Sequence, residues 1–280
     1  MTSIGIEYRA GHWKTCLLEN GQFQNFSTFT DGESIFSYIQ QLYGQSANIL
    51  VALSSPQEVP FLPLHEVTHE LLASGNELSE VQDFLHAVST IGLKGHLLPA
   101  VKYLPQVPRY RRLKYTSLGT AESLCATATL LYRMRQQDAP WSDMQFLLLE
   151  IGMVSHSITV IKDGYIVDGI GEVSIGYADA VDEEDREQAF WERLVQDLTG
   201  LIAMYQVQDI VIKDNNAATR KQRVIERLGE TYQFYLFPHI ESEPEGFEGA
   251  LGASILAEGL SGHGLNAEIA ERLLSVVPHL

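Results

Sequence analysis

Alternating apolar and polar positions, interrupted by Asn-Gly and Asp-Gly dipeptides, predict two β-meanders in this chain. The first covers residues 3–29, with expected strands at 3–7, 12–19 and 22–29. The second covers residues 144–171. Asn20-Gly21 and Asp163-Gly164 each lie between apolar runs, where such dipeptides favour the type I′ turns that match strand twist. The pattern therefore predicts a hairpin at each dipeptide.

Both meanders also carry an acidic residue at the end of their first strand. Glu7 stands thirteen residues before Asn20, and Glu150 stands thirteen residues before Asp163. A carboxylate that ends an apolar central strand is costly unless it serves a ligand or a hydrogen-bond network. The repeated strand, acid and hairpin predict a duplicated structural unit.

After each meander the spacing of apolar residues changes to an alternation of helices and strands. Helices are expected at 32–43, 64–73, 77–91, 118–137, 186–205, 218–228, 248–260 and 266–276, and strands at 48–53, 209–213 and 233–237. This order predicts an α/β protein with two mixed sheets, each a three-strand meander plus helix-strand-helix. It differs from a doubly wound dinucleotide fold, in which strand and helix alternate from the start.

A proline- and arginine-rich stretch at 92–116 is expected to be extended and irregular, and to mark the seam between two lobes at 1–117 and 118–280. The net charge of −17 argues against nucleic acid or an anionic membrane surface as the main partner. Cys16 and Cys125 are too few for a disulfide framework. No run approaches the roughly 20 apolar residues of a membrane helix. We therefore expect a soluble cytoplasmic protein.

Four segments carry a resemblance to a known superfamily: HLLPAVKYLPQVPRYRRLKYTSLGTAE, LLLEIG, KDGYIVDGIG and EGALGASILAEGL. With them the chain resembles the acetate and sugar kinase, actin and heat-shock chaperone (ASKHA) superfamily, and more narrowly a prokaryotic family of predicted butyrate kinases. The resemblance implies duplicated RNase-H-like domains of the actin-like ATPase type that close on Mg–ATP. It implies ATP-dependent phosphorylation of a short-chain, butyrate-like carboxylate, and a homodimer.

The resemblance also implies roles for individual residues. Glu7 and Glu150 match the acidic positions that are catalytic and hold Mg²⁺ through water. The residues matched to ATP contacts are Gly11, Gly152 and Ser155 at the strand crossings, and Gly249, Gly252 and Ala253 on the adenine side. Each assignment has a structural alternative: the acids can cap their own loops, and the small residues of 249–253 permit tight helix packing.

A basic stretch followed by a helix start is the candidate binding site for a carboxylate or a phosphorylated ligand. Arg109 and Arg111 can grip such a group in bidentate fashion. Gly119 and Thr120 precede a helix whose backbone N–H groups and dipole attract anions. The alternative is an ordinary helix N-cap beside a solvated basic loop.

Two departures from the superfamily pattern weaken the kinase interpretation. Both acidic residues are Glu where the superfamily has Asp, and both crossings are poor in glycine. Glycine allows backbone N–H groups to approach phosphates closely, whereas Met153 and Val154 would crowd the γ-phosphate. A non-catalytic, nucleotide-responsive or scaffolding relative therefore remains a second hypothesis.

A third hypothesis rests on His65-Glu66-Val67-Thr68-His69, which matches the zinc-peptidase pattern H-E-x-x-H. On one α-helix, the two histidines bind zinc and the glutamate acts as general base. Leu72 stands where the extended motif has glycine, and the duplication places the motif on an early connecting helix. We favour chance occurrence over a zinc hydrolase.

Overall fold

The computed structural model describes residues 2–45, 49–67, 79–152, 155–174, 182–213, 217–229, 231–239, 243–262 and 264–275. The chain forms two compact units. Lobe 1 comprises Met1–Pro105, Thr120–Asp138 and His239–Leu280, and lobe 2 comprises Gln106–Gly119 and Ala139–Pro238. The sequence predicts two contiguous lobes divided at 117/118. In the structure, three helices of the predicted second lobe, at 121–136, 248–259 and 264–274, belong to lobe 1 instead. Each lobe is therefore built from separate stretches of chain.

Lobe 1 contains a mixed sheet in the order β3-β2-β1-β4-β6-β5. Its strands are β1 (Thr2–Arg9), β2 (His12–Glu19), β3 (Gln22–Phe29), β4 (Ile49–Ser54), β5 (Leu62–Pro63) and β6 (Lys94–Leu97). The first three form an antiparallel meander, while β1, β4 and β6 run parallel. The carboxyl ends of these three parallel strands therefore lie at one edge of the sheet.

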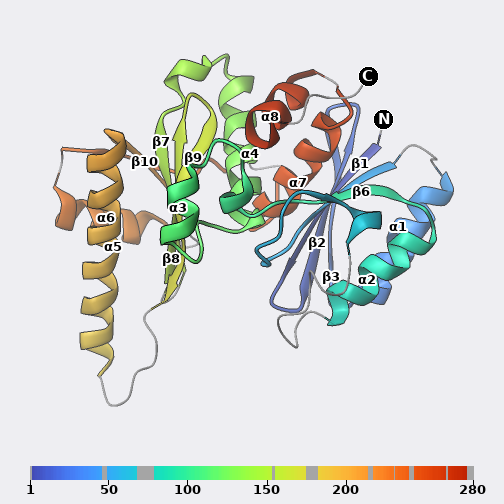
Figure 1. Ribbon diagram of the computed structural model, residues 1–280, viewed down its shortest axis with the longest axis horizontal. Helices are drawn as coiled ribbons and strands as arrows, with labels where there is room; N and C mark the ends of the chain where they lie inside the picture. Colours follow the sequence, from blue (N-terminus) through green and yellow to red (C-terminus); the bar gives the residue numbers. More distant parts are fainter. Residues whose placement is uncertain are drawn as a thin grey trace. The chain divides into compact units, whose positions relative to one another are not determined.

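The two faces of the lobe 1 sheet carry different helices. Ile4 and Ile6 of β1 pack in one cluster with α1 (Gly32–Gln45) and α2 (Ser79–Thr90), which lie side by side in Figure 1. Gly5 lies on the other face, where an added Cβ would come within 1.9 Å of the carbonyl oxygen of Ala250 in α7. The helices of this face are α7 (Glu248–Gly259), α4 (Ala121–Gln136) and α8 (Gly264–Leu274).

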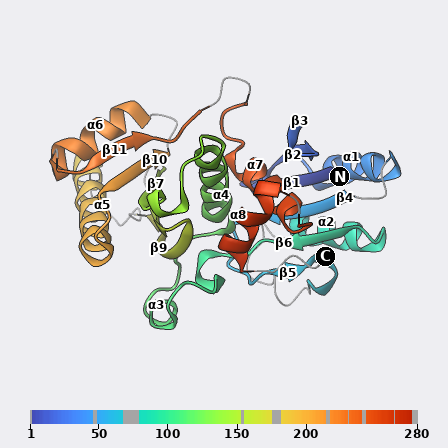
Figure 2. The ribbon, with the colours of Figure 1, turned by 90° about the horizontal axis from the view of Figure 1, so that it is seen from above.

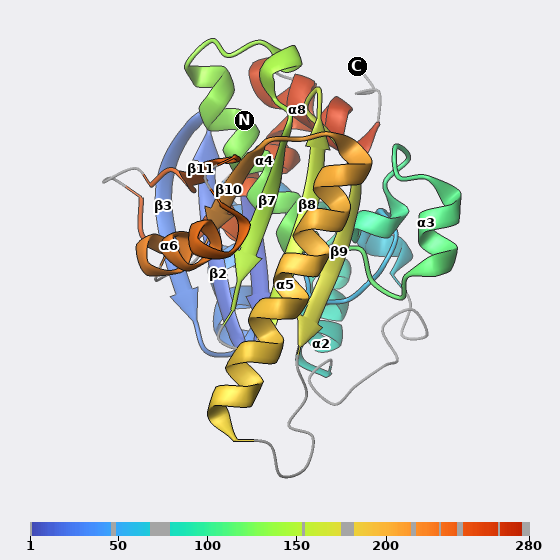
Figure 3. The ribbon, with the colours of Figure 1, turned by 90° about the vertical axis from the view of Figure 1, so that its left-hand side faces the viewer.

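Lobe 2 repeats this topology in the order β11-β10-β7-β8-β9. Its strands are β7 (Phe146–Ile151), β8 (Ser155–Lys162), β9 (Tyr165–Ser174), β10 (Asp209–Lys213) and β11 (Gln233–Leu236). Its helices are α3 (Arg109–Lys114), α5 (Glu183–Tyr205) and α6 (Ala217–Leu228). Figure 3 shows α5 lying across one face of the sheet, and Figure 2 shows α6 beside α5 and β11. The duplicated α/β fold is confirmed.

The local predictions succeed where turn and cap chemistry is strong. Asn20-Gly21 and Asp163-Gly164 all adopt positive φ angles, as their hairpin turns require. Asp31 accepts a hydrogen bond from the backbone N–H of Ser34 at 2.7 Å at the start of α1. Three 3₁₀ helices complete the described elements: η1 (Leu64–Glu66), η3 (Val101–Tyr103) and η4 (Trp141–Asp143).

Two local predictions differ from the structure. The stretch 92–116 is not irregular throughout, because it contains β6 and α3. The helix predicted at 64–73 is wrong at its start: only Leu64–Glu66 is helical, and Val67 is extended. No helix in the described part of the chain combines the length and apolar character that a membrane span requires.

Candidate functional site

Glu7 lies near the end of β1, on the face of the lobe 1 sheet that packs against α7. It is 6% exposed. In the sheet register it stands beside Lys14 of β2 on one side and Ser54 of β4 on the other. The ammonium of Lys14 donates a hydrogen bond to the carbonyl oxygen of Gly246 and lies 5.3 Å from the ring centre of Phe247. The lysine beside Glu7 is therefore held by the segment that leads into α7.

The first turn of α7 lies against the Glu7 carboxylate. A Cβ built on Gly249 would come within 2.5 Å of Cδ of Glu7 and 2.7 Å of its Oε2. Glycine at this position allows the approach because it has no side chain. The carboxylate thus faces the positive end of the helix dipole, which stabilises an anion. The sequence predicts that Gly249 contacts adenine, whereas in the structure its lack of a side chain leaves room for the carboxylate of Glu7.

The neighbouring small residues of α7 serve helix packing. A Cβ on Gly252 would lie 1.9 Å from the carbonyl oxygen of Cys125 in α4, and Ala253 is fully buried. The packing interpretation is confirmed for Gly252. The adenine-side role of Gly249, Gly252 and Ala253 stays a prediction.

Glu150 occupies the position in β7 that Glu7 occupies in β1, with its two polar neighbours exchanged. It stands beside Ser157 of β8 and Lys213 of β10. The ammonium of Lys213 donates to Oε1 of Glu150 at 2.9 Å, and the hydroxyl of Ser157 donates to Oε2 at 3.2 Å. The side chains of this ion pair are only 15% and 17% exposed. The charge of Glu150 is therefore balanced within its own lobe.

The first strand crossing is a tight two-residue turn. Ala10 and Gly11 have φ angles of 50° and 76°, and Arg9 pairs directly with His12 across it. Arg9 donates to Oε1 of Glu122 at 2.7 Å, which links the turn to the first turn of α4. Positive φ explains the glycine at position 11, and its predicted contact with phosphate remains untested.

The second crossing is held by backbone and side-chain hydrogen bonds. The N–H of Gly152 donates to the carbonyl oxygen of Ser155 at 2.8 Å, and Arg220 of α6 donates to the carbonyl oxygen of Gly152. The hydroxyl of Ser155 donates to Glu172 at 2.7 Å. Residues 153 and 154, whose side chains are predicted to crowd a phosphate, lie outside the described residues. The phosphate contacts of Gly152 and Ser155 stay predictions.

The basic stretch divides into an exposed and a buried part. Arg109 is exposed, whereas Arg111 is 2% exposed and its Nε lies 2.8 Å from Oδ1 and 2.6 Å from Oδ2 of Asp168. The hydroxyl of Tyr205 donates to Oδ2 of the same Asp168 at 2.7 Å. Burial and this hydrogen bond to Asp168 raise the pKa of Tyr205. Arg111 therefore fixes α3 to β9, a role that no local sequence pattern indicates.

The turn before α4 behaves as a helix cap. The hydroxyl oxygen of Thr120 accepts a hydrogen bond from the N–H of Glu122 at 3.2 Å, which confirms the N-cap interpretation. Gly119 has a φ of 122°, a conformation suited to glycine. Substrate binding by Arg109, Arg111, Gly119 and Thr120 stays a prediction.

The two acids differ in how well they suit a magnesium ion. Mg²⁺ keeps several waters and is held by one or two carboxylates rather than by a full protein cage, so a site of this kind does not require a ligand cluster. Among the described residues, no three metal-ligating side chains gather in one place. Lys213 already neutralises Glu150, whereas the lysine beside Glu7 bonds to Gly246. Glu150 thus already lies beside a full positive charge, and the magnesium role of both acids stays a prediction.

The zinc-hydrolase hypothesis fails on backbone conformation. Its motif needs both histidines on successive turns of one α-helix. His65 lies on the three-residue η1 with a 75% exposed side chain, and Val67 has φ −73° and ψ 117°. The helix has ended before the second histidine, His69, which lies outside the described residues.

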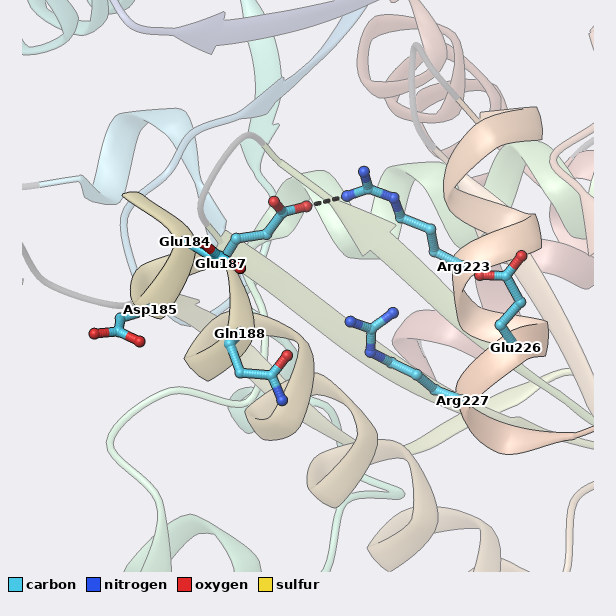
Figure 4. A pocket seen from close by; sticks show the side chains of 7 residues that line it. All are labelled: Glu184, Asp185, Glu187, Gln188, Arg223, Glu226 and Arg227. Carbon is cyan, nitrogen blue, oxygen red and sulfur yellow. Dashed lines mark hydrogen bonds and ion pairs between the residues drawn. The ribbon is translucent and has the colours of Figure 1, made fainter. Parts of the chain in front are cut away.

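A cavity of about 520 Å³ lies between α5 and α6 (Figure 4). Arg223 forms an ion pair with Glu187 there, and Arg227 lies 4.9 Å from the ring of Trp191. The lining residues are Glu184, Asp185, Glu187, Gln188, Arg223, Glu226 and Arg227. None of the site residues predicted from the sequence belongs to this lining.

A family model described as "Protein of unknown function (DUF1464)" matches residues 30–184, which is more than half of the chain. The chain belongs to the DUF1464 family. No curated protein matches this DUF1464 chain. The family description itself supplies no link to butyrate kinases.

Solved structures resemble the DUF1464 chain in fold. One is the Lmo2764 protein of Listeria monocytogenes, proposed to be an N-acetylmannosamine kinase (TM-score 0.53, 13% identity, 91% of this chain and 97% of that chain). Another is acetate kinase from Entamoeba histolytica (TM-score 0.52, 7% identity, 81% and 86%). At such identities the likeness shows the fold alone. This DUF1464 chain has the fold of the ASKHA kinases.

Proposed function

We propose that this DUF1464 protein is an ATP-dependent phosphotransferase that transfers a phosphoryl group to a small carboxylate. The observation that carries the proposal is the position of Glu7. A buried carboxylate stands near the end of the central strand of lobe 1, against the first turn of α7. Such a group requires a function or a hydrogen-bond network to offset its desolvation. The likeness in fold to an acetate kinase supports the same class of reaction.

In this proposal Glu7 holds the water shell of Mg²⁺, and ATP supplies the phosphoryl group. Most of the catalytic effect in phosphoryl transfer comes from positioning and from stabilising charge. Glu150 has a different task, because its ion pair with Lys213 joins β7 to β10 at the edge that also bears the second crossing. Arg109, which is exposed, is the arginine of the basic stretch that can reach an acid in solution.

A second candidate function is a non-catalytic, nucleotide-responsive protein. The observation in its favour is the set of contacts around the second crossing. Lys213 neutralises Glu150, and Arg220 holds the carbonyl oxygen of Gly152. Two cations that could serve phosphates are thus engaged by the protein itself.

The test is a direct assay for product. The purified protein is incubated with Mg–ATP and short-chain acids, and acyl phosphate is trapped with hydroxylamine while ADP is measured separately. The proposal expects hydroxamate from wild type and a loss of at least about 100-fold in Glu7→Gln. Glu19→Gln, an exposed acid at the end of β2, is the matched control and retains activity. ATP binding without hydroxamate or ADP favours the second candidate.

A further inference from the structure

The strand β11 lies at one end of the lobe 2 sheet and is paired with β10 along one edge (Figure 3). The N–H of Phe237, just after β11, donates to the carbonyl oxygen of Ile212 in β10 at 2.8 Å. Since alternate residues of a strand present their backbone groups to opposite edges, those of Phe234 and Leu236 point away from β10. In the described part of the chain, no strand pairs with this outer edge.

Large apolar side chains of β11 are exposed on both faces of the sheet. Tyr235 is 50% exposed and Leu236 is 43% exposed, and neighbours in a strand point to opposite faces. The stretch 231–238 has no charged residue, in a chain with a net charge of −17. Edge strands that stay free often carry a charge, a proline or a bulge that discourages pairing. The strand β11 has none of these features.

The strand β3, an uncharged edge strand of lobe 1, differs in its side chains. Its aromatic residues pack within their own lobe, with ring centres of Phe23 and Tyr132 5.8 Å apart and those of Phe26 and Phe247 5.5 Å apart. Among the described strands, only β11 has large apolar side chains that are exposed. An open backbone edge and an exposed apolar surface thus coincide at β11.

The same edge of a second copy of the chain is complementary to this one. Antiparallel pairing about a two-fold axis sets Phe234 of one copy opposite Leu236 of the other, so that their outward N–H and C=O groups bond to each other. The axis then passes through Tyr235, which faces Tyr235 of the second copy. The two residues form a non-hydrogen-bonded pair with Cα atoms about 4.5 Å apart. Apolar side chains would therefore cover each other on both faces of the sheet.

Charge favours a second copy over a charged partner segment. A charged segment would lose its water against an uncharged strand without gaining an ion pair. The neighbouring arginines of α6 contact groups on the side of the lobe away from the open edge: Arg220 bonds to Gly152, Arg223 pairs with Glu187, and Arg227 lies over the ring of Trp191. Their charges therefore do not recruit an acidic segment to the edge.

We propose that β11 is a homodimer contact, in which two copies of this DUF1464 chain pair β11 with β11 in antiparallel orientation. Tyr235 lies on the two-fold axis, and the two lobe 2 sheets form one continuous sheet. Because β11 has only four residues, we expect a reversible dimer rather than an obligate one. Dimer formation does not depend on phosphoryl transfer by Glu7.

The first experiment measures association by sedimentation velocity over a wide range of protein concentration. Tyr235→Lys places two ammonium groups face to face across the axis, where like charges are unfavourable. We expect wild type to show a monomer–dimer equilibrium and Tyr235→Lys to raise the dissociation constant at least about tenfold. Leu113→Lys is the matched control, because Leu113 is an 89% exposed apolar residue on α3, and it should associate like wild type.

The second experiment tests the register by disulfide formation under mild oxidation. Tyr235→Cys brings two thiols within the Cα separation that a disulfide accepts. Gln233→Cys is the control, because in this register Gln233 faces Phe237 of the second copy and not its own counterpart. The native Cys16 and Cys125 are fully buried. We expect a covalent dimer from Tyr235→Cys and none from Gln233→Cys.

Three results would overturn the proposal. The first is a wild-type protein that stays monomeric at every concentration. The second is a dimer that Tyr235→Lys weakens no more than Leu113→Lys does, which would place the contact elsewhere. The third is equal cross-linking of Tyr235→Cys and Gln233→Cys, which would exclude this register. Thermal unfolding checks that each variant is folded, and Leu236→Lys replaces Tyr235→Lys if that variant is not.

Discussion

Lobes 1 and 2 each carry a glutamate at the equivalent position of their sheets, but the two glutamates have different partners. Each acid stands between a lysine and a serine in the register, but the lysine is on β2 in lobe 1 and on β10 in lobe 2. Lys213 forms an ion pair with Glu150, whereas Lys14 donates to Gly246. Glu7 instead packs against the first turn of α7. A duplication has therefore kept the position of the acid and changed its partners.

This difference indicates that Glu7 and Glu150 have different roles. A carboxylate that is neutralised by a neighbouring ammonium gains little from a metal ion, because the attraction to a second cation is offset by the first. A carboxylate at a helix start faces only a partial positive charge, which offsets the attraction to a metal ion less than a full ammonium charge does. We therefore propose that the metal-linked role belongs to Glu7 in lobe 1 and that the ion pair of Glu150 with Lys213 in lobe 2 is structural.

The largest expected effect concerns the packing that brings α7 to its place in lobe 1. Gly252→Ala places a Cβ 1.9 Å from a backbone oxygen of α4, so backbone must move. We expect a loss of about 3 kcal/mol or more in the free energy of unfolding, at the upper end of overpacking effects. Gly200→Ala in α5 meets nothing within 4 Å and is the control, with a gain of about 0.5–1 kcal/mol. Urea denaturation measures both, and equal stabilities would refute the packing account.

The next effect sharpens the contrast between the two acids. Gly249→Ala pushes against the buried carboxylate of Glu7, whereas Gly152→Ala meets the hydroxyl of Ser155 at 2.7 Å, which can rotate away. We expect Gly249→Ala to lower ATP turnover at least tenfold and stability by about 1–2 kcal/mol. Gly152→Ala should cost less in both. If Gly152→Ala instead lowers turnover more than Gly249→Ala does, the glutamate that matters for function is Glu150 in lobe 2.

The ion pair of lobe 2 should show a measurable coupling. Lys213→Met leaves Glu150 partly buried without its ammonium partner, and we expect a loss of about 1–3 kcal/mol. Combining it with Glu150→Gln should restore part of that loss, giving a coupling of about 1 kcal/mol in a double-mutant cycle. The exposed pair Arg223–Glu187 is the control, with a smaller coupling. Additive losses at Glu150 and Lys213 would contradict the structural role.

The smallest effect is a pH dependence in lobe 1. Burial lowers the pKa of His96, and the charge of His65 lowers it further. Folding therefore favours the neutral ring: this contribution to stability is present above the ordinary histidine pKa of about 6.5 and is lost as pH falls through the lowered value. His96 stacks on Phe61 with ring centres 4.9 Å apart, so His96→Phe keeps the packing. The free energy of unfolding, measured with urea from pH 8 to 5, should fall less steeply with acid in His96→Phe than in wild type. An equal slope in both proteins would show that other groups cause the loss of stability in acid.

Sequence reasoning succeeded where local chemistry dictates structure. The hairpins follow from Asn-Gly and Asp-Gly, and the bounds of β2, β3 and β10 follow from alternation between turns. It failed where tertiary contacts decide. Lys94–Leu97 has no β-branched residue and becomes a strand through its parallel pairing with β4. The helix α3 follows Pro108 and is anchored by Arg111, which reaches Asp168, 57 residues further along the chain.

The candidate site shows the same limit. The positions of Glu7 and Glu150 follow from the repeat, and Lys213 could have been found by aligning the ends of two parallel strands. The approach of Gly249 to Glu7 joins residues from opposite ends of the chain, and no local pattern indicates it. The division into lobes likewise depends on where α4, α7 and α8 pack.

The most direct test of this account is calorimetric titration with ATP, with and without Mg²⁺, on wild type, Glu7→Gln and Glu150→Gln. Thermal unfolding of each variant first establishes that it is folded. The account predicts Mg²⁺-dependent binding that Glu7→Gln abolishes and that Glu150→Gln retains. Retention in Glu7→Gln together with loss in Glu150→Gln, or no ATP binding by folded wild type, would contradict it.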